Sequence, residues 1–339
     1  MFFFTSLALL YTICVGASDF NCSSPSVIGD RRRNLSQWTL AEFNVEWLFT
    51  EPYKDCPGNG CSWSTPEDEY IHLETIAKRL TSINADTVHL CEVQSCTQLE
   101  QLIELLPDSD YRAYLVQGTD SYTGQNVGLL TRVDPIKQLE RTEERVSYPV
   151  QDSKCGYVGD SGTEGVSKHL ISDFTVNNIS FTLIGVHLLS KPNDPTACTK
   201  REAQAQVLQN LIYNRTIQKK NIIVLGDLND YDGDIPDLNS DIPNSRVLRM
   251  MHGYEGIYGG EYELFSVGNN TVQSELYTEW WDETGDCLVD ETEYSAIDHI
   301  LMSQTLYERV VDVQYYHEYD EGCETYDSDH YPIVVRLEM

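Results

Sequence analysis

The sequence predicts an α/β protein in which two β-sheets pack face to face and helices cover the outside. Two observations lead to this prediction. Short apolar runs of strand length alternate with longer segments whose apolar residues recur at helical spacing. Several of the short runs are apolar on both faces, so these strands must be covered on both sides. A two-sheet core inside a layer of helices meets this requirement as one large domain, and 339 residues suffice to build it.

The first half of the chain supplies the first strands and helices. We predict a strand at 37–44 and a helix that begins at Thr65-Pro66-Glu67-Asp68. Threonine caps a helix, proline fits its first turn, and acidic side chains favour its positive end. Apolar residues then recur at helical spacing as far as Ile83. Further along we expect a strand at 87–91, a helix at 97–106, and strands at 111–117 and 126–132.

The second half continues the alternation. We predict a strand at 179–186, a long amphipathic helix at 200–217 and a buried strand at 221–226. Two more strands are expected at 295–302 and 331–337. Because the segment 312–324 is rich in acidic residues, we interpret it as solvated surface.

The N-terminus is typical of a secretory signal peptide. A short apolar run is followed by the small residues Val15 and Ala17, which suit cleavage by signal peptidase. The run is too short to cross a bilayer comfortably, which disfavours the alternative of a membrane anchor. We therefore divide the chain into a signal peptide (1–17), an extension (18–36) and a single domain (37–339). The mature protein is expected to be a monomer without membrane contact, secreted or held in the lumen of the secretory or endolysosomal pathway.

The cysteines fit an exported protein. Nine remain outside the signal peptide, and an exported chain usually pairs its cysteines in disulfides. Nine is odd, so at least one stays free, and Cys91 is the candidate because it lies inside an apolar run. Cys56 and Cys61 flank a tight turn that a disulfide could close. Acceptor sequons for N-glycosylation occur at Asn21, Asn34, Asn178, Asn214 and Asn269.

The charge of the chain restricts its partners. There are 23 lysines and arginines against 54 aspartates and glutamates, which gives a formal net charge of −31. Such a surface repels phosphate groups unless a bound metal reverses the local field. This argues against a tight, static DNA-binding module. An enzyme that meets a polyanion briefly and through cations remains compatible with the charge.

Polar residues that directly follow apolar strands carry the functional information. A strand end is a rigid mount, which metal and acid–base chemistry require. Oxygen-rich side chains without Cys/His metal spacing indicate Mg²⁺ or Mn²⁺ rather than zinc, and histidines beside carboxylates indicate proton transfer. Together they form a set suited to attack on a phosphodiester. The six clusters are Asn44 with Glu46, Glu92, His187, the run 227–230, Asp298 with His299, and the run 328–330.

These clusters belong to six motifs that occur in a characteristic order. They are Phe43-Asn44-Val45-Glu46-Trp47, Glu92-Val93-Gln94, Gly185-Val186-His187-Leu188, Gly226-Asp227-Leu228-Asn229-Asp230, Ile297-Asp298-His299-Ile300-Leu301 and Ser328-Asp329-His330-Tyr331-Pro332. In this order the chain resembles the endonuclease/exonuclease/phosphatase superfamily, which has the deoxyribonuclease I-like fold. The resemblance extends over 38–337. It implies a two-sheet α/β sandwich of that type, with helices packed outside.

The resemblance also implies a role for each site residue. Glu92 matches the principal carboxylate ligand of the metal, with Asn44 and Asp329 near the same ion and Glu46 as a further ligand. His330 matches a histidine that acts as general base or holds the phosphate, and Asp298 orients it. His187 matches a second histidine that donates to the phosphate or the leaving oxygen. Asp227 and Asn229 match the pair that positions the attacking water and binds the scissile phosphate. Whether Asp227 or His330 takes the proton of the water is left open.

Several residues need separate interpretation. Gln125 stands where the pancreatic deoxyribonuclease branch has an acid that supports the histidine equivalent to His187. His299 should point away from Asp298 on its strand and is interpreted as structural. We expect His72, His89, His169, His252 and His317 to be surface or core residues. The acidic run 230–234 fails the EF-hand register, although a looser structural Ca²⁺ site there stays open.

The sequence thus predicts a secreted nuclease that uses Mg²⁺ or Mn²⁺ to hydrolyse phosphodiester bonds of DNA, with RNA as an alternative substrate. A second hypothesis keeps the fold but changes the substrate to a lipid or inositol head group, as in sphingomyelinases. Asp230 after the Gly226–Asn229 motif favours the nuclease. A binding protein that has lost catalysis is disfavoured, because every central position carries a competent residue. Substrate choice is expected to reside in the loops 51–64 and 148–165.

Overall fold

The structure is a computed structural model that describes residues 21, 22, 25, 27–50, 62, 63, 65–107, 110–319, 323 and 325–339. The predicted signal peptide lies outside the described residues, as do Cys56, Cys61 and most of the loop 51–64. The described end of the extension packs against the domain, where Arg31 forms an ion pair of 2.6 Å with the buried carboxylate of Asp134.

Two β-sheets form the centre of the molecule. Six strands make up one sheet: Gln37–Leu48 (β1), Thr87–Val93 (β2), Arg112–Leu115 (β3), Asn126–Thr131 (β4), Val310–Tyr315 (β14) and Ile333–Glu338 (β15). Five make up the other: Lys168–Val176 (β7), Ile179–His187 (β8), Asn221–Asp227 (β9), Leu264–Ser266 (β10) and Asp298–Ser303 (β13). Their orders are β14-β15-β1-β2-β4-β3 and β10-β13-β9-β8-β7. Two small pairs are Val146–Tyr148 (β5) with Gly162–Glu164 (β6), and Glu279–Trp280 (β11) with Tyr294–Ser295 (β12).

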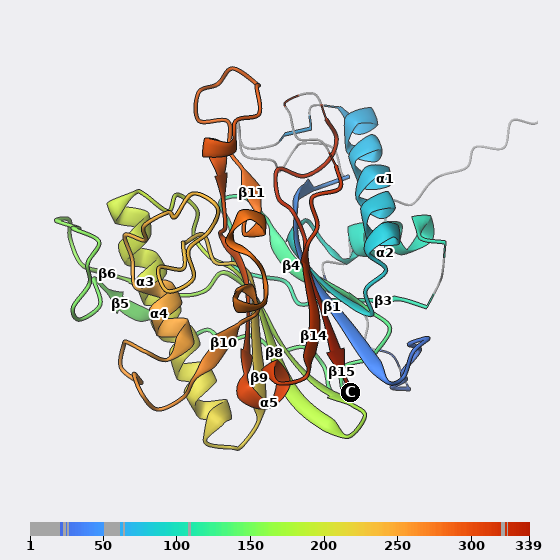
Figure 1. Cartoon of the computed structure of the whole chain (residues 1–339), viewed down its shortest axis with the longest axis horizontal. Helices are drawn as coiled ribbons and strands as arrows, with labels where there is room; N and C mark the ends of the chain where they lie inside the picture. Colours follow the sequence, from blue (N-terminus) through green and yellow to red (C-terminus); the bar gives the residue numbers. More distant parts are fainter. Residues whose placement is uncertain are drawn as a thin grey trace, which may run out of the picture.

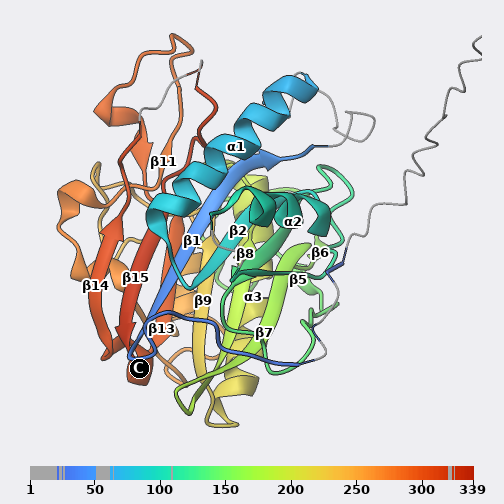
Figure 2. The ribbon, with the colours of Figure 1, turned by 90° about the vertical axis from the view of Figure 1, so that its right-hand side faces the viewer.

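Helices cover the outer face of each sheet, so the molecule has four layers (Figure 1, Figure 2). Pro66–Ile83 (α1) and Cys96–Leu105 (α2) pack on the six-stranded sheet. Pro195–Thr216 (α3) and Val247–His252 (α4) pack on the five-stranded sheet. Among the described residues, the connections contain a further short helix, Gln304–Tyr307 (α5), and three single-turn 3₁₀ helices, Val267–Asn270, Gln273–Glu275 and Glu291–Glu293. This arrangement confirms the predicted sandwich of two sheets with helices outside.

The strand β1 shows how one strand serves two interfaces. Trp38 and Leu40 point into the core between the sheets, whereas Phe43 packs towards the helices, because successive side chains leave a strand on opposite faces. After Leu40 the row that faces the other sheet becomes polar, with Glu42 and Asn44 both buried. The apolar core therefore ends in a polar region towards one edge of the sandwich.

The helix α1 begins and ends as its sequence predicts. The side chain of Thr65 accepts a hydrogen bond from the backbone N–H of Asp68 at 3.1 Å, and Pro66 occupies the first turn. The helix ends at Asn84, whose φ of 47° is a left-handed conformation that asparagine tolerates. Its apolar side, which includes Ile76 and Leu80, is fully covered by the six-stranded sheet.

The helix predicted at 200–217 differs from the prediction in two respects. It is α3, and it begins earlier, at Pro195, because Asp194 caps it with its side chain. The prediction that it is amphipathic is wrong. Its buried side carries the charged residues Arg201 and Glu202, both fully buried, and each forms an ion pair with an oppositely charged buried side chain. Buried charge pairs break the apolar periodicity on which the prediction depended.

The sheets also differ in detail from the prediction. The strand expected at 295–302 is divided, since Ser295 ends β12 and β13 begins only at Asp298. The strands β7, β10 and β14 were not anticipated. Part of the segment 312–324 lies in β14, and its described acidic residues, Asp312 and Glu318, are exposed as expected of a solvated acidic face. Asp312 is exposed there, but Tyr315 and Tyr316 are buried.

Three disulfides join described cysteines: Cys22–Cys96, Cys155–Cys198 and Cys287–Cys323. Cys91 is free and fully buried, which confirms the prediction for this residue. Within the part of the chain that the structure describes, no helix has both the length and the apolar composition needed to cross a bilayer.

Gly226 is the glycine on which the position of Asp227 depends most directly. Its φ is 135°, and a Cβ atom at this position would lie 1.8 Å from the backbone oxygen of Val186 on the adjacent strand. We expect Gly226→Ala to lower the free energy of unfolding by at least about 3 kcal/mol, from backbone strain and overpacking together. Chemical denaturation monitored by circular dichroism measures this loss.

Gly124→Ala is the matched control, because Gly124 also has a positive φ, 73°, but nothing lies within 4 Å of the added Cβ. Its expected cost is about 1 kcal/mol. Equal losses in the two variants would contradict the steric explanation for Gly226.

Candidate active site

Four polar side chains lie side by side across the five-stranded sheet. Asp298 at the start of β13 is the register partner of Asp227 at the end of β9. Asp227 is also the partner of His187 at the end of β8, and His187 in turn is the partner of Lys168 at the start of β7. Residues that are paired in register project from the same face of a sheet. The row therefore faces the six-stranded sheet at the polar edge of the sandwich.

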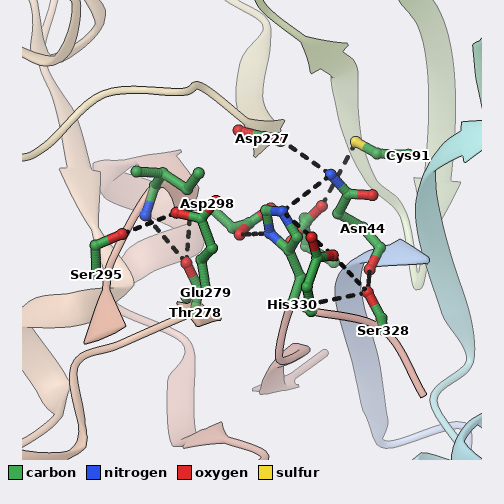
Figure 3. Close-up of polar contacts among 12 residues, drawn as sticks. Asn44, Cys91, Asp227, Thr278, Glu279, Ser295, Asp298, Ser328 and His330 are labelled. Carbon is green, nitrogen blue, oxygen red and sulfur yellow. Dashed lines mark hydrogen bonds and ion pairs between the residues drawn. The ribbon is translucent and has the colours of Figure 1, made fainter. Parts of the chain in front are cut away.

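Asn44 on β1 meets this row from the opposite sheet (Figure 3). Its side-chain amide donates a hydrogen bond of 3.1 Å to Oδ2 of Asp227 and lies 3.4 Å from Nε2 of His330. The structure thus brings Asn44, Asp227, Asp298 and His330 together from three strands and the segment before β15. These residues are at most 5% exposed, so water has limited access to the hydrogen bonds among them.

His330 and Asp298 form the closest charged pair of the site. Nδ1 of His330 lies 2.7 Å from Oδ2 of Asp298, and the Nε2 atom faces Asn44. Burial alone would lower the pKa of His330, but the negative charges of Asp298 and Asp329 outweigh it and hold the pKa well above its usual value. Nδ1 therefore carries a proton, and Asp298 fixes the orientation of the ring.

The segment around His330 is fixed by the backbone as well as by Asp298. Ser328 accepts a hydrogen bond from the backbone N–H of His330 at 3.0 Å and donates one of 2.7 Å to the backbone oxygen of Asn44. Tyr319 donates to the backbone oxygen of His330. Thr278 accepts a 3.0 Å hydrogen bond from the N–H of Asp298. Both members of the pair are thus held in place by surrounding residues.

Three more carboxylates adjoin this centre. Oε2 of Glu92 accepts from the backbone N–H of Trp47 at 3.0 Å, and Oε2 of Glu46 accepts from that of Asp329 at 3.2 Å. Glu46, Trp47 and Glu92 have φ values of 46°, 50° and 63°. Such conformations are strained for these residue types, and strain of this kind clusters at functional sites.

The carboxylates repel one another. Burial together with the charge of Glu92 raises the pKa of Glu46 to about 7, and burial together with Glu46 raises the pKa of Asp329 well above its usual value. Burial and Asp298 do the same for Asp227. A bound cation would relieve this repulsion and return the groups to their ionised state.

This donor set fits a divalent metal that prefers oxygen. Glu92, Asp329 and Glu46 supply carboxylate oxygens, and Asn44 supplies an amide oxygen at the same edge, which are the ligands of Mg²⁺ and Mn²⁺. Hydrogen bonds connect Glu46 to Asn44 and to Asp329, and the charge of Glu92 acts on both Glu46 and Asp329, so the four predicted metal ligands are neighbours in the structure.

His187 occupies the position expected of it but has different support. Its Nε2 lies 3.4 Å from Oδ2 of Asp227 and 3.9 Å from Oε1 of Glu92, while its buried Nδ1 has no hydrogen-bond partner among the described residues. Gln125, which the sequence placed behind this histidine, instead accepts a 3.1 Å hydrogen bond from Nζ of Lys168. Burial and the charge of Lys168 lower the pKa of His187, so its ring is neutral.

Asn229 lies beside Asp227, as predicted, with its side chain directed to the backbone. Its N–H donates to Oδ1 of Asp227 at 2.8 Å, and its side-chain amide donates to the backbone oxygen of Leu188 at 3.3 Å. Its φ of 51° is left-handed, which asparagine adopts more readily than most residues. Asn229 therefore helps to fix the carboxylate of Asp227.

Two residues of this region escaped the sequence analysis. Lys168 is 91% buried, directly beside His187, and no carboxylate among the described ion pairs accompanies it. Glu279 on the two-residue strand β11 pairs with His330 through a backbone bridge and accepts a hydrogen bond from Ser295. Neither residue follows a long apolar strand. The search for polar residues after apolar strands, which identified the other residues, therefore missed both.

The remaining candidates lie away from the site. His299 points to the other side of β13, where Nε2 lies 2.8 Å from the backbone oxygen of Asp230. The acidic run 230–234 does not converge on one cation position, because each aspartate meets a different basic side chain of the protein. Four of the other histidines are buried in the protein interior, namely His72, His89, His169 and His252. His317 is partly buried.

The overall arrangement was compared with known proteins. No protein-family profile matches the chain, and no curated protein sequence is similar to it. Solved structures do match. TDP2 of Caenorhabditis elegans, in truncated form, is 16% identical with a TM-score of 0.52, over 89% of this chain and 98% of the other. An endonuclease/exonuclease/phosphatase family protein of Bacteroides thetaiotaomicron is 18% identical with a TM-score of 0.53, over 89% and 94%.

The chain shares its fold with solved endonuclease/exonuclease/phosphatase family proteins. A mannosyl-6-phosphatase of Bacteroides thetaiotaomicron shares it, with 17% identity and a TM-score of 0.51 over 88% of this chain and 98% of the other. The fold expected from the six motifs is thereby confirmed. At these identities the comparison establishes the fold of the superfamily and leaves the activity to the residues of the site.

The pair of Asp298 with His330 can be tested without any substrate. In metal-free protein, Asp298→Asn keeps the shape of the side chain but removes its charge. We expect the pKa of His330 to fall by about one to three pH units, because the imidazolium loses its nearest anion. Titration of the histidine side-chain nitrogens by NMR measures this change. Asp312→Asn, an exposed aspartate on β14, is the matched control. An unchanged His330 pKa in Asp298→Asn would contradict the assigned pair.

Proposed function

We propose that this chain is a secreted, divalent-metal-dependent phosphodiesterase that hydrolyses DNA. The observation that carries the proposal is the centre where Asn44, Asp227 and the His330–Asp298 pair meet beside the carboxylates of Glu46, Glu92 and Asp329. This centre contains a proton-transfer group, carboxylates suited to a cation that prefers oxygen, and amide donors, all at one buried edge of the sandwich. The superfamily fold supports a hydrolase that acts on phosphoester bonds.

In the proposed reaction a water molecule attacks phosphorus, and the bond to the leaving sugar oxygen breaks. The water loses one proton to a base, and the leaving oxygen takes one proton, so hydrolysis yields a phosphate end and a hydroxyl end. Asp227 accepts hydrogen bonds from Asn44 and Asn229 and is the group placed to orient the water. His330 carries a proton that Asp298 stabilises, which suits it to hold the phosphate.

His187 and Lys168 lie on the other flank of Asp227. The ammonium of Lys168 provides the one buried cation of this row, beside the neutral His187. Both side chains are placed to stabilise charge on phosphate oxygens in the transition state. A divalent metal held by Glu92, with Asn44, Asp329 and Glu46, would supply further positive charge and polarise the phosphate.

DNA is the proposed substrate for two reasons. Among structures with this fold is a TDP2 of D. rerio complexed with a single-strand DNA product, which is 16% identical over 90% of this chain with a TM-score of 0.51. Next to Asp329 lies a depression of about 220 Å³, whose wall includes Trp281, an indole that is 63% exposed. Exposed aromatic rings beside a phosphate site are suited to stack on bases.

Secretion is proposed from the N-terminal sequence and the disulfides. Three disulfides join described cysteines, a number typical of proteins from oxidising compartments. The five sequon asparagines are all exposed, so each is accessible to glycosylation.

Digestion of supercoiled plasmid by the purified secreted protein tests the proposal. With Mg²⁺ or Mn²⁺ we expect nicked and then linear DNA, and with excess chelator we expect none. His330→Ala and Glu92→Gln, prepared identically, should lower the rate by about 10²-fold or more, because each removes a group used in the transition state. Asp312→Asn should cleave at the wild-type rate.

An intact plasmid at all metal concentrations would contradict the DNA endonuclease proposal. Equal activity in wild type and His330→Ala would reveal a contaminating nuclease. RNA and linear DNA in the same assay separate a different nucleic-acid preference from the absence of nuclease activity.

A specific observation favours a second candidate, the hydrolysis of choline-bearing phospholipids. The depression beside Asp329 is also lined by Trp63, Trp280 and Asp282, and no lysine or arginine is among its described lining residues. Aromatic rings with nearby carboxylates recognise quaternary ammonium groups. If this candidate is correct, the protein releases phosphocholine from sphingomyelin, Trp281→Ala lowers that rate about tenfold, and plasmid stays intact. Absence of phosphocholine release rules the candidate out.

A further inference from the structure

A second cluster of potential metal ligands lies deeper in the sandwich than the candidate active site. Glu42, His89 and Cys91 are each fully buried, and one ligand atom from each lies within 4.8 Å of the others. None of the three has a role in the proposed reaction. Cys91 is also the free cysteine of the described chain, and Figure 3 shows it beside Asn44.

The strand register explains why these side chains meet. β1 and β2 are parallel neighbours, and Glu42 is the direct partner of His89. Cys91 follows His89 by two residues, so it projects from the same face of the sheet. That face is directed towards the five-stranded sheet. Gly185 on β8 of that sheet leaves the space for the imidazole, because a Cβ there would lie 2.4 Å from Nε2 of His89.

Three polar atoms of the cluster lack a hydrogen-bond partner, whereas Sγ of Cys91 also lies 3.4 Å from the backbone oxygen of Val186. Both ring nitrogens of His89 and Oε2 of Glu42 have no hydrogen bond among the described residues. The described ion pairs include no lysine or arginine on Glu42, and the charged groups that act on it are the carboxylates Asp298 and Asp227 and the imidazole of His330. A buried carboxylate and a buried imidazole left in this state are costly, and a bound cation would satisfy both.

Two of the three spacings between the ligand atoms are close to those around a tetrahedral metal, and the third is below 4.8 Å. Oε1 of Glu42 lies 3.7 Å from Nδ1 of His89 and 3.7 Å from Sγ of Cys91. Typical Zn²⁺ bond lengths and a tetrahedral angle place such ligand atoms about 3.4–3.6 Å apart. Cysteine sulfur with imidazole and carboxylate is the mixed ligand set of Zn²⁺ and differs from the all-oxygen set at Glu92.

We propose that Glu42, His89 and Cys91 bind a structural Zn²⁺ ion between the two sheets. The unpartnered Oε2 of Glu42 is a further donor within the same cluster. The ion would join β1 and β2 close to the candidate active site, because Glu42 lies two residues before Asn44 and Cys91 lies one residue before Glu92. It would thereby fix the strand ends that carry the proposed catalytic metal ligands. Because the cluster is closed to solvent, the ion enters during folding and stays during dialysis.

Metal analysis of the full secreted chain tests this proposal independently of any activity. The protein is produced with Zn²⁺ in the medium, dialysed against EDTA and then against metal-free buffer, and its metal content is measured by mass spectrometry. We expect about one Zn²⁺ per folded chain. Glu92→Gln is the matched control and should retain it, whereas Cys91→Ser and His89→Gln should contain less than about a tenth of an equivalent.

Two further measurements apply if those variants fail to fold. Unfolding of the wild type in guanidinium chloride with a colorimetric chelator should release Zn²⁺ in the same transition as the loss of circular dichroism. Protein folded with Co²⁺ in place of Zn²⁺ should show a thiolate-to-cobalt charge-transfer band in the near ultraviolet.

Folded wild-type protein without tightly held metal after EDTA would overturn the proposal and indicate a protonated Glu42 in a metal-free core. Retention of Zn²⁺ by folded Cys91→Ser and His89→Gln would overturn it equally. Neither result bears on plasmid cleavage, so this proposal and the proposed function can fail separately.

Discussion

The structure depends on the register between the strands of the two packed sheets. In the five-stranded sheet this register aligns Asp298, Asp227, His187 and Lys168 in one row, and the facing sheet brings Asn44 against it. A shift of one residue in any of these strands would turn its side chain to the opposite face, towards the helices. The apolar core between the sheets fixes the register. The positions of the site residues at the edge of this core are therefore fixed as well.

The same packing concentrates negative charge. Carboxylates at the ends of several strands meet in a region closed to water, and the pKa values of Glu46, Asp227 and Asp329 are all raised there. Within this region Asp298 is balanced by the protonated His330. A bound cation would neutralise the charge of the other carboxylates. The proposed phosphodiesterase would use this cation to bind a polyanionic substrate. In the proposed phosphodiesterase, a bound metal would set the local field at this point and would let a protein with a net charge of −31 approach DNA.

The sequence was sufficient for the fold class and for naming most residues of the candidate site, because the informative residues follow long apolar strands. Asp227 after 221–226 and His187 after 179–186 are examples in which the strand itself is unmistakable. Lys168 and Glu279 were missed because one begins its strand and the other lies on a strand of only two residues. Their positions beside His187 and His330 follow from strand pairing, which connects residues far apart in the sequence.

Buried charge caused the other failures. Arg201 and Glu202 on α3 face the interior with partners from distant segments, so the helix does not show the amphipathic pattern expected of it. His89 was correctly expected to lie in the core, but a single sequence does not reveal that Glu42 is its direct neighbour on the adjacent strand. Such contacts become visible only when the strands are placed side by side.

The central claim is that the strand ends form a binding site for a divalent metal at Glu92. Anomalous X-ray diffraction from crystals soaked in Mn²⁺ and measured at the manganese edge tests it most directly. We expect a strong peak within coordination distance of the Glu92 carboxylate and bordered by Asn44 and Asp329. The absence of a peak at Glu92, or a peak only at a different position, would contradict it.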